Sequence, residues 1–186
     1  LNQALHRIDM EIPNLSAVLL THEHTDHIKG LATFVKKYEL PVYATFGTGA
    51  AILQKLPQAK KNLRLFAGGE TFSVDGLRGQ SMPISHDAAE PVAYRIDGGG
   101  HQLGYVTDTG FLSDEVQQTI CGCDTVVLES NHDVDMLRHG PYPFYLQQRI
   151  RGKLGHLSNE ACADGALEVV KNGAKRLVLA HLSDKN

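Results

Sequence analysis

A seven-residue stretch, T-H-E-H-T-D-H at positions 21–27, constrains the fold of this chain more than any other feature. It follows a short apolar run at 17–20, which is typical of a buried strand. Behind it, apolar residues recur at helical spacing from Ile28 to Tyr38 and predict an amphipathic helix. The stretch therefore occupies a sharp turn between the carboxyl end of a strand and the amino end of a helix.

The side chains in this stretch indicate metal binding, because neutral imidazole is the commonest metal ligand and carboxylates join it around divalent ions. His22 and His24 alternate as on a strand, so their side chains leave on the same side. Asp26 and His27 follow the turn and can face a second ion. A zinc site of the H-E-x-x-H type does not fit, since the second histidine lies at i+2. The alternative is a polar loop with chance histidines, and the density of the cluster argues against it.

The composition limits the class of protein. With 186 residues, 42% of them hydrophobic and 21% charged, the sequence suits one soluble globular domain at 1–186. The net charge of −3 gives no overall nucleic-acid signature but allows a local basic groove. We expect no membrane span and no signal peptide. Three cysteines without a disulfide or zinc pattern favour a reducing compartment, the cytoplasm.

The pattern of elements predicts an α/β (α+β) protein with mixed sheets covered by helices. We expect helices at 1–11, 28–38, 47–56, 113–120 and 158–171, and strands at 16–20, 41–45, 63–66, 71–74, 77–82, 92–96, 102–107, 125–128 and 176–180. Gly68-Gly69 and Asp75-Gly76 are typical of hairpin turns between short strands. Ser113 and Ser158 are expected to cap their helices, and Gly173 to end the later one.

Three further side chains lie where predicted strands end, which is where ligands and catalytic groups gather in sheet proteins. They are His86, Asp108 and His181. Each alone could be structural: a histidine bonded to a loop, an aspartate capping a turn, or a histidine at the rim of a sheet. Together with the cluster at 21–27, they favour metal ligation.

The order H-x-H-x-D-H, followed by His, Asp and His at strand ends, resembles the metallo-β-lactamase fold superfamily. Segments 129–133 and 155–160 resemble its bacterial YycJ/WalJ branch of single-domain 5′→3′ DNA exonucleases. The resemblance covers nearly the whole chain and implies a four-layer αββα sandwich without an inserted cap domain. Two strands with which the family usually begins, and a supporting aspartate on them, have no counterpart here, and the sequence stops soon after His181. We therefore expect a fragment of the fold.

The resemblance also implies a dinuclear metal centre containing zinc, manganese or iron. One ion would be bound by His22, His24 and His86, a second by Asp26, His27 and His181, and Asp108 would bridge them. Two such cations can clamp a phosphodiester and lower the pKa of a water between them. Asp26 would orient that water or accept its proton.

Glu129 and His156 match a pair that resembles a proton donor for the leaving oxygen in related nucleases of the fold. The alternative is that Glu129 pairs with an arginine and that His156 is a loop histidine before Ser158. Asn131 and His132 are expected to cap or line the same rim as substrate-binding residues.

Segment 138–153 carries cations and aromatic rings that could contact a single strand, with Arg149 and Arg151 as the expected substrate-binding cations. The alternative is a long loop pinned by prolines and buried aromatics. Taken together, we expect an enzyme, a dinuclear metal-dependent phosphodiesterase, and specifically an exonuclease acting on single-stranded DNA ends.

Two other readings remain open. One is another hydrolase on the same metal core, cleaving a thioester, lactam or small phosphodiester. The pair of Glu129 and His156 argues against it, as does the lack of a recognisable small-substrate loop. The other is a metal-stabilised regulatory module without turnover, and the retained Asp26 and Asp108 argue against that.

Overall fold

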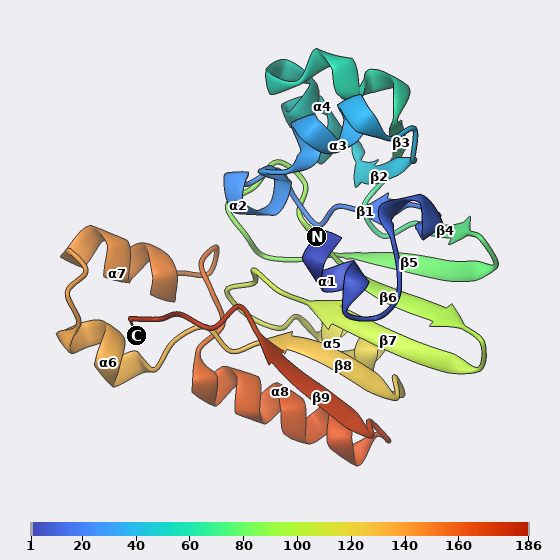
Figure 1. Cartoon of the computed structure of the whole chain (residues 1–186). Helices are drawn as coiled ribbons and strands as arrows, with labels where there is room; N and C mark the ends of the chain where they lie inside the picture. The colour runs from blue at the N-terminus through green and yellow to red at the C-terminus, as the bar shows by residue number, and fades with distance from the viewer. Residues whose placement is uncertain (1, 186) are drawn as a thin grey trace. The chain divides into compact units, whose positions relative to one another are not determined.

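The computed structural model describes residues 2–185 and divides the chain into two compact units (Figure 1). The first unit holds the chain up to Ala67 together with Ala88–Glu90. The second unit holds Gly68–Asp87 and the chain from Pro91 onward. Each unit has its own sheet and its own hydrophobic core.

The first unit is built on a three-stranded parallel sheet in the order β1-β2-β3. Its strands are β1 Val18–Leu19, β2 Val42–Thr45 and β3 Leu63–Phe66. Its helices are α1 Asn2–His6, η1 Ile12–Asn14, α2 Thr25–Ile28, α3 Leu31–Lys37, α4 Phe46–Lys55 and η2 Pro57–Lys61. Parallel strands need crossover connections, and α3 and α4 lie in the two crossovers. Val35, Val42 and Ile52 are buried in the core between sheet and helices.

Local sequence explains where the first unit departs from the predicted elements. The helix expected over 1–11 ends at His6, because Asp9 adopts a left-handed turn with φ of 53°. Its first residue, Leu1, lies outside the described residues. The helix expected over 28–38 is α3, which begins only at Leu31, after Gly30, a residue of low helix propensity. Ile28 instead ends the preceding short helix, α2. The strand expected over 16–20 is only two residues long.

The second unit is built on a six-stranded mixed sheet in the order β4-β5-β6-β7-β8-β9. Its strands are β4 Thr71–Val74, β5 Leu77–Pro83, β6 Val92–Gly98, β7 His101–Val106, β8 Thr125–Glu129 and β9 Arg176–Ala180. Its helices are α5 Asp114–Ile120, α6 Val134–His139, α7 Phe144–Arg151 and α8 Asn159–Lys171. Strands β4 to β7 form an antiparallel meander, and β7, β8 and β9 run parallel. Helix α8 packs against β8 and closes the core over Val126 and Val169 (Figure 1).

In the second unit, the structure confirms two predicted helix caps and one predicted turn, all of which depend on residues close together in the sequence. Ser113 accepts a hydrogen bond of 3.3 Å from the amide of Val116 and begins α5. Ser158 likewise begins α8. Asp75-Gly76 turns the β4–β5 hairpin with positive φ at both residues, as this tight turn requires.

One prediction about a connection is wrong, and the alternative of a long loop at 138–153 does not hold. Gly68-Gly69 does not join a hairpin, because β3 pairs in parallel with β2 and the chain then leaves for the other sheet. Segment 138–153 is not one long loop, since it holds the end of α6 and the whole of α7. Asp133 caps α6 by accepting hydrogen bonds from the amides of Asp135 and Met136.

None of the helices within residues 2–185 has the length and apolar character needed to cross a bilayer.

Candidate metal and catalytic site

The first unit gathers the histidines of the 21–27 stretch around the buried ring of His22. The centroid of that ring lies 4.6 Å from the His24 ring and 4.1 Å from the His27 ring. Strand β1 ends at Leu19 and α2 begins at Thr25, so the backbone turns within the stretch. Three imidazoles that converge at this distance form a ligand set typical of a metal site.

Asp26 lies in the first turn of α2, beside this cluster. Its Oδ2 is 3.6 Å from Nε2 of His27, and its side chain is 70% exposed. The exposed carboxylate is therefore available for ligation or for work on a bound water.

Glu23, which lies between two of the histidines, anchors the segment Ala88–Glu90 to the first unit. Its Oε1 accepts a hydrogen bond of 2.8 Å from the amide of Ala89. Its Oε2 lies 3.4 Å from the hydroxyl of Thr48. Glu90 completes the attachment by accepting a hydrogen bond of 2.6 Å from the amide of Gly47. The sequence analysis assigned no role to Glu23. A carboxylate between two clustered histidines was the one signal that this side chain accepts hydrogen bonds in the folded protein.

In the second unit, three parallel strands bring their carboxyl ends together. Val106 is paired with Leu128, and Glu129 with Ala180. Asp108 and His181 follow the ends of β7 and β9, so they flank the last residue of β8. Both have left-handed backbones, with φ of 60° and 55°. Such conformations cost about 1–3 kcal/mol in non-glycine residues and cluster at functional sites.

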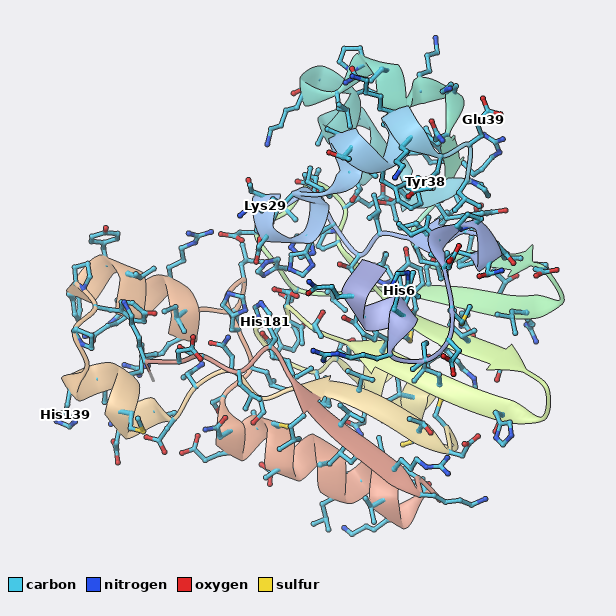
Figure 2. The ribbon with its side chains drawn as sticks, in the orientation of Figure 1. His6, Lys29, Tyr38, Glu39, His139 and His181 are labelled. Carbon is cyan, nitrogen blue, oxygen red and sulfur yellow. The ribbon has the colours of Figure 1, made fainter. Side chains whose placement is uncertain are left out.

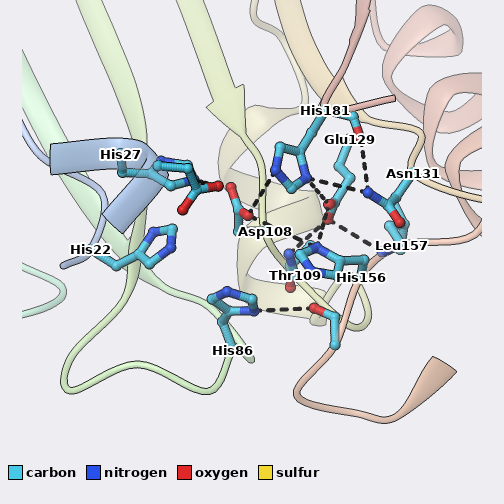
Figure 3. Close-up of polar contacts among 12 residues, drawn as sticks. His22, His27, His86, Asp108, Thr109, Glu129, Asn131, His156, Leu157 and His181 are labelled. Carbon is cyan, nitrogen blue, oxygen red and sulfur yellow. Dashed lines mark hydrogen bonds and ion pairs between the residues drawn. The ribbon is translucent and has the colours of Figure 1, made fainter. Parts of the chain in front are cut away.

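Glu129 is the centre of this group (Figure 3). Its carboxylate is fully buried, and its Oε1 lies 2.8 Å from Nδ1 of His156 and 2.8 Å from Nδ1 of His181. Its Oε2 accepts hydrogen bonds from the amides of Thr109 and Leu157, at 2.8 Å and 3.2 Å. Burial would raise the pKa of the Glu129 carboxyl, but the hydrogen bonds from the two histidines and the amide outweigh it and lower the pKa below its usual value.

These contacts fix the tautomers of both histidines. An ionised carboxylate only accepts, so the Nδ1–H groups of His156 and His181 donate and their Nε2 atoms face elsewhere. Nε2 of His181 lies 3.3 Å from Oδ1 of the buried Asp108. An imidazole oriented by a carboxylate behind it is the usual arrangement of a metal-binding histidine.

Asp108 and His181 offer the donor atoms for a divalent cation in this group, and Glu129 and His156 lie against them. One ligand atom from each of Asp108, Glu129, His156 and His181 lies within 4.8 Å of the others. Carboxylate oxygen and imidazole nitrogen in this combination suit zinc, manganese or iron.

His86 joins the second unit's group through its ring. Its centroid is 5.2 Å from that of His156, and its Nδ1–H donates to the carbonyl of Gly155 at 3.1 Å. Burial is the largest influence on His86 and lowers its pKa, despite the nearby carboxylate of Asp108. The neutral imidazole that results is the form that binds metals.

The four residues expected to bind substrate have different surroundings. Asn131 donates a hydrogen bond of 2.8 Å to the carbonyl of His181, so it supports the loop that carries this histidine. His132 is buried, and its carbonyl accepts the amide of Asn159. Arg149 is bound to Asp87 at 2.7 Å, whereas Arg151 is exposed on α7. Substrate contact by these residues stays a prediction.

The predicted metal ligands thus form two groups, one in each unit. The first unit gathers His22, His24, Asp26 and His27, and the second gathers His86, Asp108 and His181. His156 and Glu129 belong to the second group.

Sequence comparison agrees with the chemistry of these groups. The family described as beta-lactamase superfamily domain matches residues 1–182. The exodeoxyribonuclease YycJ of Bacillus anthracis is 40% identical over 181 residues, which cover 96% of this chain and 68% of that protein. The exodeoxyribonuclease WalJ of Streptococcus pneumoniae is 36% identical over 187 residues, which cover 98% of this chain and 69% of that protein.

Structural comparison shows the same fold in a zinc-bound protein. The crystal structure of Zn²⁺-bound PqqB from Methylobacterium extorquens matches with a TM-score of 0.69 and 23% identity. The match covers 91% of this chain and 63% of PqqB, so the chain spans less than two thirds of that protein's length. The expected α/β fold of the metallo-β-lactamase type is confirmed.

Proposed function

The chain belongs to the metallo-β-lactamase superfamily, and on that premise we propose that it is a metal-dependent phosphodiesterase, specifically a 5′→3′ DNA exonuclease. The observation that carries the proposal is the contact of 2.8 Å between Nδ1 of His156 and the buried Oε1 of Glu129. This pair provides a proton donor of the kind that a phosphodiester's leaving oxygen needs. The identity to exodeoxyribonucleases from two bacteria supports DNA as the substrate.

We propose two divalent ions, zinc or manganese with iron as a further candidate, held by the seven side chains of the superfamily pattern. His22, His24 and His86 would hold one ion, Asp26, His27 and His181 the other, and Asp108 both. When bound, such ions stabilise charge on phosphodiester oxygens and make water nucleophilic near neutral pH. Within each unit the predicted ligands lie close to one another, which supports their role in metal binding.

Three side chains of this chain would take part in proton transfer, each with a different role. His156 donates its Nδ1–H to Glu129, so its Nε2 is the atom that would deliver a proton to the leaving oxygen. Glu129 would stabilise the imidazolium before delivery and keep the ring oriented. The exposed carboxylate of Asp26 would orient the attacking water or accept its proton.

We further propose that 1–186 is one metallo-β-lactamase-fold domain without an inserted cap, which would leave the site open to a strand end. The chain between Asp108 and His156 supports this, because α5, β8, α6 and α7 take up most of it. The substrate would then be a single-stranded DNA end.

The test is a set of parallel assays on protein of measured metal content. We expect metal-dependent release of mononucleotides from 5′-phosphorylated single-stranded DNA, and no turnover of nitrocefin or a glutathione thioester. Asp26→Ala should abolish release. Turnover of a thioester or lactam without DNA cleavage would assign the chain to another hydrolase of the fold. Metal binding without any turnover would make it a regulatory module.

A further inference from the structure

We propose that the exposed side chains of α6 and α7 form a platform that binds single-stranded nucleic acid outside the reacting site. The platform consists of Phe144 and Tyr145 with the cations Arg138, Arg151 and Lys153. This inference rests on the proposed nuclease function and adds the contact that would hold the rest of the strand.

The two aromatic rings are the first observation. Phe144 and Tyr145 are each 74% exposed, which makes them the most exposed large hydrophobic side chains in the described part of the chain. They adjoin each other at the start of α7, whose core contact is made by the buried Ile150. Rings left in water contribute little to folding, whereas exposed aromatic faces stack bases of any sequence.

The local charge is the second observation. Between Val134 and Lys153 the sequence carries four lysines and arginines against one carboxylate, Asp135, a balance of 4 − 1 = +3 in a chain of net −3. Arg138 makes an exposed contact of 3.5 Å with Asp135. Phosphates are therefore attracted to this segment of an otherwise acidic chain, which argues for an anionic partner. The exposed rings beside these charges argue for a nucleic acid over an acidic protein surface.

The spacing along α7 connects the rings to the site of the second unit. Phe144 and Arg151 are seven residues apart and share one face of the helix, and Tyr145 and Arg149 are four apart and share the adjacent one. Arg149 is held at 2.7 Å by Asp87, the neighbour of His86.

The end of α7 is also fixed directly to the histidines. The amide of His156 donates to the carbonyl of Ile150 at 2.9 Å, and His86 donates to the carbonyl of Gly155. Seven residues of helix rise by about 10 Å, so the rings lie about that far along α7 from its fixed end. The platform would hold bases beyond the reacting phosphate.

Helices α6 and α7 pack against each other, which brings Arg138 on α6 and the rings of α7 onto neighbouring elements (Figure 1). Figure 2 shows side chains projecting from both helices, with His139 at the end of α6.

Equilibrium binding tests the platform separately from the chemistry. A fluorescent, 5′-phosphorylated twelve-nucleotide oligo(dT) is titrated with His156→Ala protein, which keeps the strand intact. Adding Phe144→Ala or Tyr145→Ala should weaken binding between about fivefold and a hundredfold per ring. Arg151→Gln should reduce the slope of log affinity against log salt by about 0.7. Leu167→Ala and Lys171→Gln on α8 are the matched controls and should leave binding unchanged.

Kinetics on the histidine-intact protein separate this inference from the proposed function. Tyr145→Ala should raise KM for the oligonucleotide but not for bis(p-nitrophenyl) phosphate, which is too short to reach α7. Unchanged oligonucleotide binding by the Phe144→Ala/Tyr145→Ala double variant would overturn the platform even if the enzyme cleaves DNA. The surface would instead be a contact between copies of the chain if the double variant binds DNA normally but no longer self-associates in sedimentation. If the protein cleaves no DNA but its oligonucleotide binding still depends on the two rings, the proposed nuclease function is refuted and the platform stands.

Discussion

Glu129 and His181 are joined by a hydrogen bond of 2.8 Å between Oε1 and Nδ1, at an oxygen that also receives Nδ1 of His156. One buried carboxylate therefore orients both a candidate metal ligand and the candidate proton donor. The loss of its charge should affect metal binding and proton transfer together, which no purely structural carboxylate would do.

We predict that Glu129→Gln lowers the affinity for the divalent ion by about 10- to 100-fold. The amide has one acceptor oxygen instead of two and no charge to hold the imidazoles. The measurement is metal retained after dialysis against graded chelator, by elemental analysis. Glu168→Gln on the exposed face of α8 is the control. Wild-type metal affinity in a folded Glu129→Gln protein would contradict the orienting role.

Glu23→Ala should loosen the segment Ala88–Glu90 at Ala89, while the hydrogen bonds to Glu90 keep its end attached. The variant removes the acceptor of the 2.8 Å hydrogen bond from the Ala89 amide, and a bond to a charged group contributes about 1.5–3 kcal/mol. We expect a lower urea midpoint and much faster hydrogen exchange at Ala89. Glu39→Ala, at a side chain that is 92% exposed, should change neither. Protection of Ala89 that survives in Glu23→Ala would show that other contacts hold the segment.

Gly155→Ala should destabilise the second unit at the end of α7. A Cβ at this position would overlap the carbonyl oxygens of Arg149 and Ile150, and backbone atoms cannot move aside cheaply. We expect a loss of about 1–3 kcal/mol in the free energy of unfolding. Gly30→Ala is the contrasting case, because its Cβ meets nothing within 4 Å and its φ is −88°. It should be neutral or stabilise by up to about 1 kcal/mol. Equal effects of the two variants in urea titrations would argue against this packing.

Asp124 should make stability depend on pH at the acid end. Its Oδ2 accepts a hydrogen bond of 2.7 Å from the amide of Gln102, and this bond lowers the pKa of its carboxyl. The pKa of the Asp124 carboxyl is therefore lower in the folded protein than in the unfolded chain. Its stabilising effect is complete above the pKa of the unfolded chain, and it is lost as the pH falls through the pKa of the folded protein. Asp124→Asn should therefore be less stable than wild type at pH 7, and the difference should narrow below about pH 4. Urea titrations over this pH range measure the two stabilities, with Asp164→Asn as the control. A stability difference between Asp124→Asn and wild type that stays constant with pH would refute the prediction.

Much of the candidate site could be predicted because its ligands are close in the sequence. The cluster of His22, His24 and His27 lies within one turn, so its convergence required only a strand followed by a helix. Strands such as Leu63–Phe66 and Arg176–Ala180 have the predicted limits, because turn residues mark at least one end of each.

Other features depended on pairing that the sequence does not display. The link from Glu129 to His181 arises from the parallel register of β8 and β9, in which Glu129 lies opposite Ala180. Likewise, β3 pairs with β2 because parallel pairing completes the first sheet, although Gly68-Gly69 looks like a hairpin turn. The short helices on either side of Pro141 were missed because proline-rich segments are typical of loops.

Release of mononucleotides from 5′-phosphorylated single-stranded DNA by metal-loaded wild-type and His156→Ala protein tests the central claim most directly. The account predicts that the wild type releases mononucleotides, that chelator abolishes release, and that His156→Ala lowers kcat by about 10²- to 10⁴-fold at unchanged metal content. A His156→Ala protein that cleaves at the wild-type rate, or a metal-loaded wild type that releases no nucleotide, would contradict it.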